Sequence, residues 1–176
     1  MRNLFFILAS FILLTSCGGG SSSNEKSTKS TKPTKPCSFL TEAEIKEVLS
    51  LPEDAPTTME DVVYTYPTCS YEWETLIYEK PTTISGQDMV LEYPYTLMIV
   101  TVANANKSMY EKSIVVYKDG ENVSGLGEMA MWGDSMSQVT FLSDGYMIHL
   151  SLKVSADNKD NKDKAIELAK LVKERL

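Results

Sequence analysis

A small set of side chains in this 176-residue sequence combines reactive chemistry with a suggestive spacing. The chain has a single histidine, His149, and nine methionines. Met129 and Met131 lie two residues apart, as do Met147 and His149, so each pair would share one face of a strand. Thioether and imidazole groups are ligands that suit Cu(I). One hypothesis is therefore a periplasmic Cu(I) site formed by Met129, Met131, Met147 and His149.

A plainer interpretation of the same residues stays open. Methionine is a common filler of hydrophobic cores, and Trp132 and Met136 belong to the same methionine-rich stretch. A lone histidine on the polar face of a strand is more often solvated than bound to a metal. We therefore assign no metal and no cofactor as the first expectation.

Catalytic patterns are weak. A Ser–His–acid triad would have to use His149, and the sequence has neither Gly-x-Ser-x-Gly nor a catalytic Cys motif. The many acidic residues offer carboxylate pairs for glycoside cleavage, but none of these pairs stands in a distinctive motif. We expect a protein that is not an enzyme, with an uncharacterised hydrolase as an alternative.

Two further motifs have structural interpretations. Gly125-x-Gly127-x-x-Ala130 matches the dinucleotide fingerprint formally, but it leads into a predicted hairpin and not into a helix, so it predicts a tight turn. Asp157, Asp160 and Asp163 lack the spacing of a calcium loop. We interpret them as capping acids in the first turns of a helix.

Composition and charge narrow the class of protein. With 43% hydrophobic and 23% charged residues the chain is globular, which excludes collagenous, coiled-coil and wholly disordered proteins. The net charge is −7, and only two arginines are present. Nucleic acid is excluded as a partner, because phosphate neutralisation needs clustered basic side chains.

The N-terminus predicts export and lipid attachment. Arg2 precedes an apolar run over residues 4–14, which is too short for a membrane span but fits the core of a signal peptide. The run ends in Leu14-Thr15-Ser16-Cys17, which resembles the lipobox of bacterial lipoproteins. Residues 1–16 are then a signal peptide, and Cys17 carries the acyl chains. The expected partner is the lipid bilayer, and the expected location is the extracytoplasmic side of the cell envelope, at the outer membrane in a Gram-negative cell.

Residues 17–36 contain the lipidated Cys and a tether rich in Ser, Thr, Lys and Pro, which cannot form a core. Four lysines against one glutamate give the tether a net charge of +3. Residues 37–176 hold 12 basic and 23 acidic residues, a net of −11, and form a single expected domain. The tether lysines either contact anionic headgroups or only keep the tether soluble.

The two remaining cysteines, Cys37 and Cys69, predict a disulfide in an oxidising compartment. Closing a loop of this length stabilises a domain by roughly 3–4 kcal/mol. A zinc or redox role is disfavoured, because no Cys-x-x-Cys motif and no nearby His is present.

The hydrophobic pattern predicts an α+β domain: an antiparallel sheet of about five or six strands with an N-terminal and a C-terminal helix. Thr41 and Glu44 form a capping box for a helix within residues 37–51, which Pro52 ends. The expected strands are a short one at 62–66, one that contains Cys69, Tyr71 and Trp73 in alternation, and a central one at 95–103.

In the second half we expect a helix at 107–112, a strand at 114–117, and strands at 128–132, 138–142 and 146–154. Asp144-Gly145 predicts a two-residue hairpin turn, and residues 159–176 predict the C-terminal helix.

Several of these segments together resemble a family. They are Pro36-Cys37-Ser38-Phe39-Leu40-Thr41 before a helix, the strand with Cys69 and Trp73, and Gly125-Leu126-Gly127-Glu128-Met129-Ala130 before a hairpin. This pattern resembles uncharacterised surface lipoproteins of actinobacterial type, with their Cys-x-Leu-Leu-Thr, Cys-x-Trp and Gly-Leu-Gly-Asp-x-Ala motifs. It is more distantly similar to extracellular sensor domains of bacterial receptor kinases. Here Trp73 lies two positions later than in the family motif, and Glu128 replaces Asp.

The resemblance implies a disulfide-tied α+β domain and no assigned activity. We expect a membrane-anchored lipoprotein whose domain binds a small ligand or an envelope protein.

Overall fold

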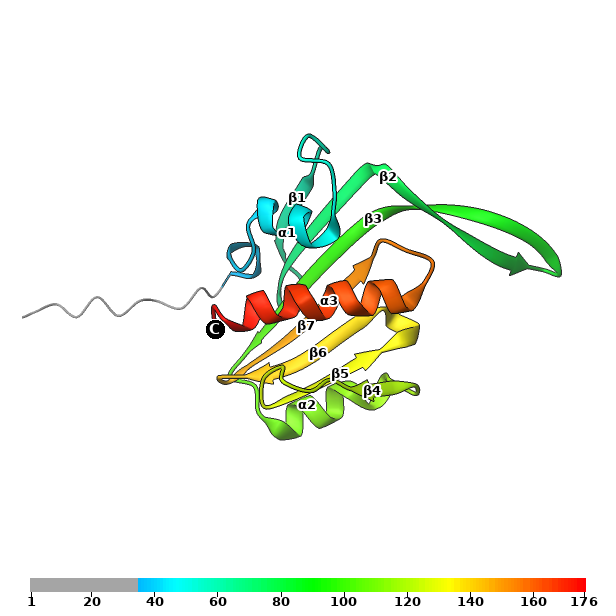
Figure 1. The fold of residues 1–176 in the computed structure, drawn as a ribbon. Coiled ribbons are helices and arrows are strands. Elements are labelled where there is room, and N and C mark those ends of the chain that lie inside the picture. Colours follow the sequence, from blue (N-terminus) through cyan, green and yellow to red (C-terminus); the bar gives the residue numbers. More distant parts are fainter. Residues whose placement is uncertain (1–34) are drawn as a thin grey trace, which may run out of the picture. The chain divides into compact units, whose positions relative to one another are not determined.

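The computed structural model describes residues 35–176, which form one antiparallel sheet with helices packed on it (Figure 1). The seven strands follow the spatial order β1-β2-β3-β7-β6-β5-β4. The coarse expectation of an antiparallel sheet with helices holds, but seven strands replace the expected five or six. The predicted signal peptide, Cys17 and most of the tether lie outside the described residues.

The chain enters through a short 3-10 turn, η1 (Pro36–Ser38), and helix α1 (Glu42–Leu49). The predicted capping box is confirmed: the Thr41 hydroxyl accepts from the Glu44 backbone N–H, and the Glu44 carboxylate accepts from the Thr41 N–H at 2.8 Å. The predicted disulfide between Cys37 and Cys69 is also present, and it fastens η1 to the sheet.

The first strand, β1 (Thr58–Val63), lies earlier than the expected strand at 62–66. It pairs with the start of β2 (Pro67–Ile84), so that Val63 lies opposite Pro67. Residues 64–66 are needed for the turn between the two strands. The expected strand was therefore misplaced, because its β-branched and aromatic run extends into that turn.

Strands β2 and β3 (Gln87–Ala103) form the longest hairpin of the fold. As predicted, β3 is central: its second half pairs with β2 on one side and with β7 (Tyr146–Lys153) on the other. The register shifts between Trp73 and Ile77. Beyond this irregularity β2 and β3 pair only with each other, and they project past the sheet as a two-stranded arm over residues 77–94 (Figure 1).

After β3 the chain forms α2 (Lys107–Ser113), close to the predicted helix. The strand expected at 114–117 is wrong, because η2 (Ile114–Val116) continues the helical backbone, with the Ile114 N–H donating to the Tyr110 carbonyl. A short edge strand that the sequence pattern did not predict, β4 (Gly120–Asn122), follows.

The remaining strands β5 (Met129–Gly133), β6 (Gln138–Ser143) and β7 agree with the predictions to within one or two residues. Asp144 and Gly145 both have positive φ (51° and 77°), as a type I′ hairpin turn requires. Gly127 also has positive φ, and a Cβ there would lie 2.3 Å from the Leu142 carbonyl oxygen. The Gly-x-Gly motif is therefore a tight turn, as predicted.

Helix α3 (Asn158–Lys173) packs with α1 on one face of the sheet, and the main core lies between them. Under these helices the side chains of β2, β3, β6 and β7 are fully buried at six large positions: Trp73, Leu97, Ile99, Phe141, Ile148 and Leu150. Near the C-terminus, Arg175 binds the Glu44 carboxylate and the Phe39 carbonyl, which joins the end of α3 to the start of α1.

This contact gives the fold a pH dependence. The Arg175 guanidinium, followed by the Thr41 backbone and hydroxyl, lowers the pKa of Glu44 from 4.5 to about 2. A depressed carboxyl pKa stabilises the fold above pH 4.5, and this contribution is lost as the pH falls toward 2. Glu44→Gln keeps the capping hydrogen bond but removes the charge. We expect it to reduce stability at pH 7 and to flatten the acid-induced loss of stability, as measured by urea unfolding at pH 7 and pH 3.

Glu47→Gln on the same helix is the matched control, because no ion pair of Glu47 occurs within residues 35–176. Identical pH profiles for the two variants would contradict the assignment.

Candidate functional site

The structure places the four predicted Cu(I) ligands on one face of the sheet. Met129 and Met131 lie on β5, and Met147 and His149 lie on β7. The register aligns all four with the face opposite α1 and α3, where α2 packs. Trp132 points to the other face and is fully buried, while Met136 lies in the 3-10 turn η3 (Asp134–Met136).

The four side chains do not converge on one point, because β6 lies between the two strands that carry them. Leu142 stands between Met129 and Met147, and Thr140 stands in the next row between Met131 and His149. Neighbouring strands are about 4.8 Å apart, which separates β5 from β7 by about 10 Å. The methionines contact the apolar cluster under α2, which is the role of core fillers.

His149 belongs to a partly buried polar network that the sequence did not predict. Its Nδ1 lies 2.8 Å from the Thr140 hydroxyl and 3.3 Å from the Gln138 amide nitrogen, and the Tyr117 hydroxyl lies 2.6 Å from the Thr140 hydroxyl. Burial lowers the pKa of His149. The Tyr117 ring fills the space above Gly133, where a Cβ would lie 2.5 Å from a ring carbon. The network holds η2 and Tyr117 against the sheet around a neutral imidazole.

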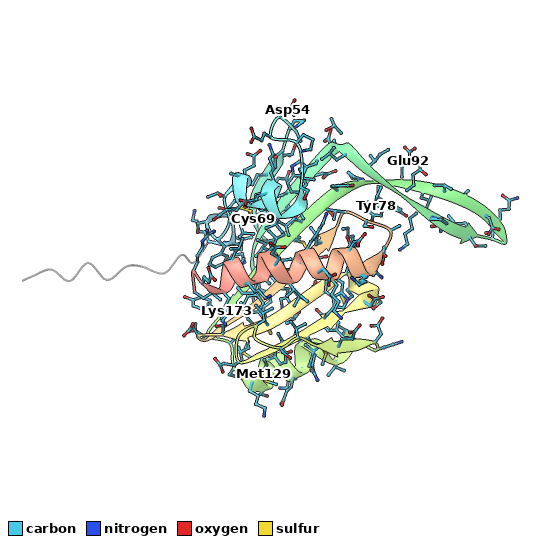
Figure 2. All side chains as sticks on the ribbon, in the orientation of Figure 1. Asp54, Cys69, Tyr78, Glu92, Met129 and Lys173 are labelled. Carbon is cyan, nitrogen blue, oxygen red and sulfur yellow. A yellow bond between two sulfur atoms is a disulfide. The ribbon has the colours of Figure 1, made fainter. Side chains whose placement is uncertain are left out.

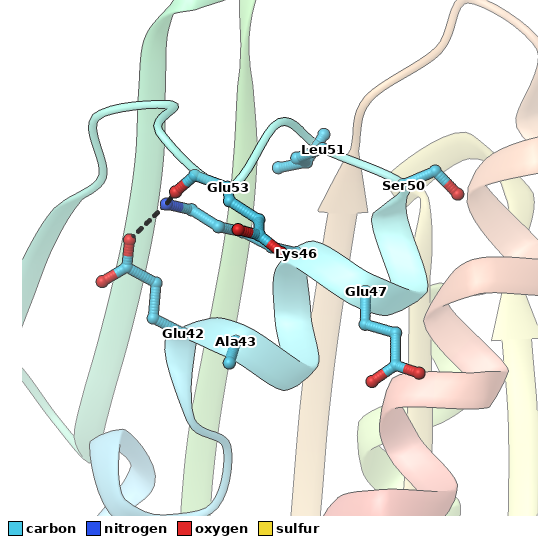
Figure 3. A pocket seen from close by; sticks show the side chains of 7 residues that line it. All are labelled: Glu42, Ala43, Lys46, Glu47, Ser50, Leu51 and Glu53. Atoms are coloured by element: carbon cyan, nitrogen blue, oxygen red, sulfur yellow. Dashed lines mark hydrogen bonds and ion pairs between the residues drawn. The ribbon is translucent and has the colours of Figure 1, made fainter.

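A groove of about 740 Å³ runs along the outer side of α1 (Figure 3). Its only cation, Lys46, donates to the Glu53 carbonyl at 2.8 Å and pairs with Glu42 at 2.7 Å. Glu42 in turn accepts from the Thr57 hydroxyl. Lys46 and Glu42 already stabilise the loop after α1, so neither side chain is available to a ligand.

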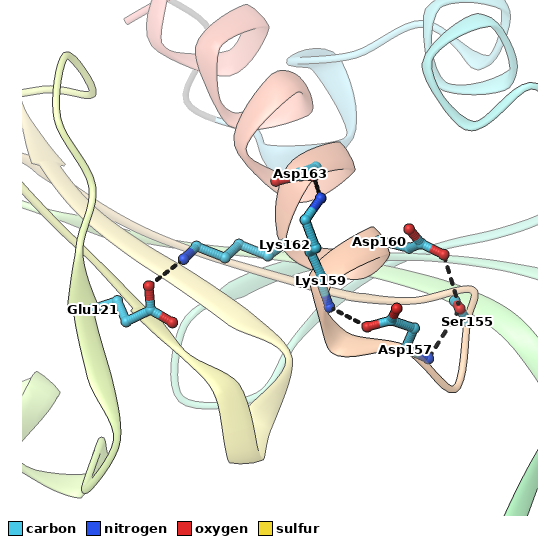
Figure 4. A network of polar contacts seen from close by, with 7 residues as sticks. All are labelled: Glu121, Ser155, Asp157, Lys159, Asp160, Lys162 and Asp163. Carbon is cyan, nitrogen blue, oxygen red and sulfur yellow. Dashed lines mark hydrogen bonds and ion pairs between the residues drawn. The ribbon is translucent and has the colours of Figure 1, made fainter.

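Of the three acids at the start of α3, Asp157 caps the helix and Asp160 lies in its first turn, as predicted, whereas Asp163 lies beyond the first turn (Figure 4). Asp157 is the N-cap and accepts from the Lys159 N–H at 2.8 Å, while Asp163 pairs with the Lys159 ammonium. Asp160 accepts from the Ser155 hydroxyl. Among residues 35–176, no group of three or more His, Cys, Asp or Glu side chains is placed to hold a metal ion.

A second hollow, of about 410 Å³, lies under the arm, and we call it the arm cleft. The arm contributes Tyr78, Lys80, Thr82 and Tyr93. The opposite side is formed by η3 and the residue after it, the end of β7, and the first turn of α3, with Asp134, Ser135, Ser137, Lys153, Ser155, Asn158 and Asn161. Its size falls within the range of roughly 300–1,000 Å³ for small-ligand sites.

Side-chain hydrogen bonds hold the side of the arm cleft that lies opposite the arm. Asn158 donates to the Asp134 carboxylate at 2.9 Å and accepts from the Ser137 hydroxyl at 3.0 Å. The Asp134 carboxylate also accepts from the Trp132 indole N–H. The side-chain oxygen of Asn161, a residue that is 1% exposed, accepts hydrogen bonds from the backbone N–H groups of Val154 and Ser155 in the turn between β7 and α3. These bonds fix η3, β7 and α3 relative to each other.

The arm presents its aromatic side chains to the cleft. The rings of Tyr78 and Tyr93 stack with centroids 5.6 Å apart, and Tyr95 lies 6.3 Å from Tyr78. Burial, followed by the neighbouring Tyr93, raises the pKa of the Tyr78 phenol, so this phenol is a neutral hydrogen-bonding partner at physiological pH. The Tyr93 side chain remains 38% exposed.

Sequence reasoning missed the arm cleft, although one signal pointed to it. The period-2 alternation of the central strand continues well beyond residue 95, through Tyr95, Tyr93, Leu91 and Met89. The Pro and Gly residues of 81–94 concealed this continuity.

Comparisons with protein-family models, with curated proteins and with solved structures find no match to this chain. Within residues 35–176, no helix is long and apolar enough to cross a membrane.

The arrangement of the methionines yields a direct test of the copper hypothesis. Because β6 separates the two ligand pairs and His149 Nδ1 is already hydrogen-bonded, we expect the full chain to bind Cu(I) no more tightly than micromolar. Titration against a competing Cu(I) chelator measures this affinity. Tight binding that is lost in both Met131→Leu and His149→Asn would contradict the structural interpretation and restore the copper site.

Proposed function

We propose that this protein is a lipid-anchored binding protein of the bacterial cell envelope and that its ligand occupies the arm cleft. The observation that carries the proposal is the arm itself. It extends the helix-facing side of the sheet beyond the helices that cover it, and it leaves stacked tyrosines over a hollow with a rigid polar base.

The energetic cost of the arm supports a role in binding. An isolated two-stranded ribbon is only marginally stable in water, because it makes few apolar contacts to offset the conformational entropy that the chain loses on folding. This arm also leaves apolar side chains exposed, and these are Ile77, Ile84, Met89, Val90 and Tyr93. The register places Ile84, Met89 and Tyr93 on the face of the cleft and Ile77 and Val90 on the other face. A ligand that covers the cleft face would recover burial that the free protein lacks.

Binding is favoured over catalysis by the contacts of the only imidazole. His149 lies on the face opposite the helices, enclosed by Thr140 and Gln138, and it does not line the arm cleft. The cleft offers hydroxyl, amide and ammonium groups, and its one carboxylate, Asp134, already accepts hydrogen bonds from Asn158 and Trp132, so these groups recognise a ligand without an imidazole base.

The anchor is the part of the proposal that depends on sequence alone. We expect mass spectrometry of the membrane fraction to find the N-terminal peptide beginning at Cys17 with diacylglycerol and acyl additions, because acyl chains hold the domain at the bilayer. The Cys17→Ala variant should leave the membrane fraction. An unmodified Cys17 in membrane-bound protein would contradict the anchor.

The cleft is tested by ligand-dependent thermal stability of the full chain. A ligand that binds only the folded state raises its melting temperature. We expect at least one of three envelope fractions (polysaccharide, dispersed lipid or peptide digest) to raise the melting temperature of the wild type. Tyr93→Leu, which removes one stacked ring, should abolish that increase.

Tyr64→Leu is the matched control, since Tyr64 is 77% exposed in the turn between β1 and β2, outside the arm cleft. The proposal fails if no fraction stabilises the wild type, or if the same fraction stabilises Tyr93→Leu equally.

A further inference from the structure

The turn between β1 and β2 exposes an unusual set of side chains. Tight turns normally use Gly, Asn, Asp or Ser, as Ser85-Gly86 and Asp144-Gly145 do in this fold. Residues 63–66 instead have the sequence Val-Tyr-Thr-Tyr, and we call them the tyrosine turn. All four side chains are exposed, Tyr64 at 77%. Turn geometry does not call for these aromatic residues, which points to a contact outside the fold.

The backbone of the tyrosine turn is well held. Val63 stands opposite Pro67 in the hairpin, and the Thr68 hydroxyl donates to the Tyr66 carbonyl at 3.0 Å. The next residue, Cys69, is fixed by the disulfide. A turn that is ordered in advance loses little conformational entropy when its side chains bind a partner.

The tyrosine turn lies close to the point where the tether enters the domain. The Lys35 ammonium lies 3.8 Å from the carboxylate of Asp61, and Cys37 is bonded to Cys69, which stands opposite Asp61 in the sheet. Val63 follows two residues later on the same strand, a separation of about 7 Å. The folded domain therefore presents this turn at its tether end.

The tether itself is short. Only residues 18–34 separate the expected lipid anchor at Cys17 from Lys35. Tethering converts a second contact with the same surface into an intramolecular event with a high effective concentration. A few exposed apolar side chains beside the tether are then enough to hold the domain on the bilayer.

The chemistry of the tyrosine turn matches the interface of a bilayer. Residues 62–71 carry no charge, in a domain of net charge −11, so this segment is not itself repelled by anionic headgroups. Tyrosine combines an apolar ring with a polar hydroxyl, and it is enriched where hydrocarbon meets headgroups. Val63 adds an apolar side chain next to the two rings.

We propose that the tyrosine turn contacts the bilayer that anchors the chain, with the Tyr64 and Tyr66 rings among the lipid headgroups. Strand β2 begins beside this turn and ends at the tip of the arm, with Cys69 near its start and Tyr78 on the arm (Figure 2). The contact therefore directs the arm cleft away from the membrane. The inference rests on the proposed lipid anchor and adds a contact made by the folded domain.

Tryptophan fluorescence tests the contact, because the native Trp73 and Trp132 are both fully buried. The lipidated full chain carrying Tyr64→Trp is reconstituted in vesicles of phosphatidylethanolamine and phosphatidylglycerol, with plain or brominated acyl chains. Bromine quenches tryptophan only at short range. We expect the brominated vesicles to reduce the added emission of Tyr64→Trp about twofold, because the ring lies in the interface.

Val115→Trp is the matched control. Val115 is 76% exposed on η2, before β4, the strand at the opposite edge of the sheet from β1. Its added emission should be the same in plain and brominated vesicles.

A further pair of variants removes the contact and keeps the reporter. Val63→Ser combined with Tyr66→Ser, in the Tyr64→Trp background, should restore most of the emission in brominated vesicles. Both side chains are exposed, so their replacement leaves the core intact. Val115→Ser combined with Val116→Ser in the same background should leave the quenching unchanged.

The outcomes separate the contact from the anchor. Equal quenching of Tyr64→Trp and Val115→Trp, or quenching of neither, overturns the inference. An emission of Tyr64→Trp that shifts with protein concentration in the absence of vesicles also overturns it, because a second copy then covers the turn. A chain that floats with the vesicles without quenching at position 64 keeps the anchor and refutes the contact, whereas an unmodified Cys17 refutes the anchor and the contact with it.

Discussion

The alternation of side chains along one long hairpin determines both the core and the candidate site. In β3 the residues Ile99 and Leu97 point to the helices and are fully buried, and Tyr95 continues the same row. Because side chains alternate with a period of two, Tyr93 and Met89 must point the same way even though no helix reaches them. The same face of the hairpin therefore contributes to the core and forms the arm side of the cleft.

The two faces of the sheet have different roles as a consequence. The helix face carries the main core, and it is locked by the disulfide and by Arg175. The other face carries a smaller cluster under α2 and the network around His149, Thr140 and Tyr117. On both faces most polar groups are already bonded within the fold. The arm differs from both faces, because no helix covers its tyrosines.

The sequence predicted those features that depend on local signals. The capping box of Thr41 and Glu44 and the hairpin turn at Asp144-Gly145 need only neighbouring residues, and both are present. The Cys37–Cys69 disulfide followed from counting cysteines. Features that depend on distant partners were misjudged: Ile114–Val116 has β-branched residues but continues a helix, and β4 exists only because β5 offers it an edge. The arm cleft joins residues from 78 to 161, a separation that no local pattern reveals.

We propose that the arm is an ordered extension of the sheet that a ligand completes. The test is hydrogen–deuterium exchange of the full chain, free and saturated with the envelope fraction that raises its melting temperature. Amides of residues 77–94 pair only within the ribbon, so they should exchange faster than those of residues 97–102 in the free protein and slow markedly in the complex. Unchanged exchange across the arm in the saturated complex would contradict the claim.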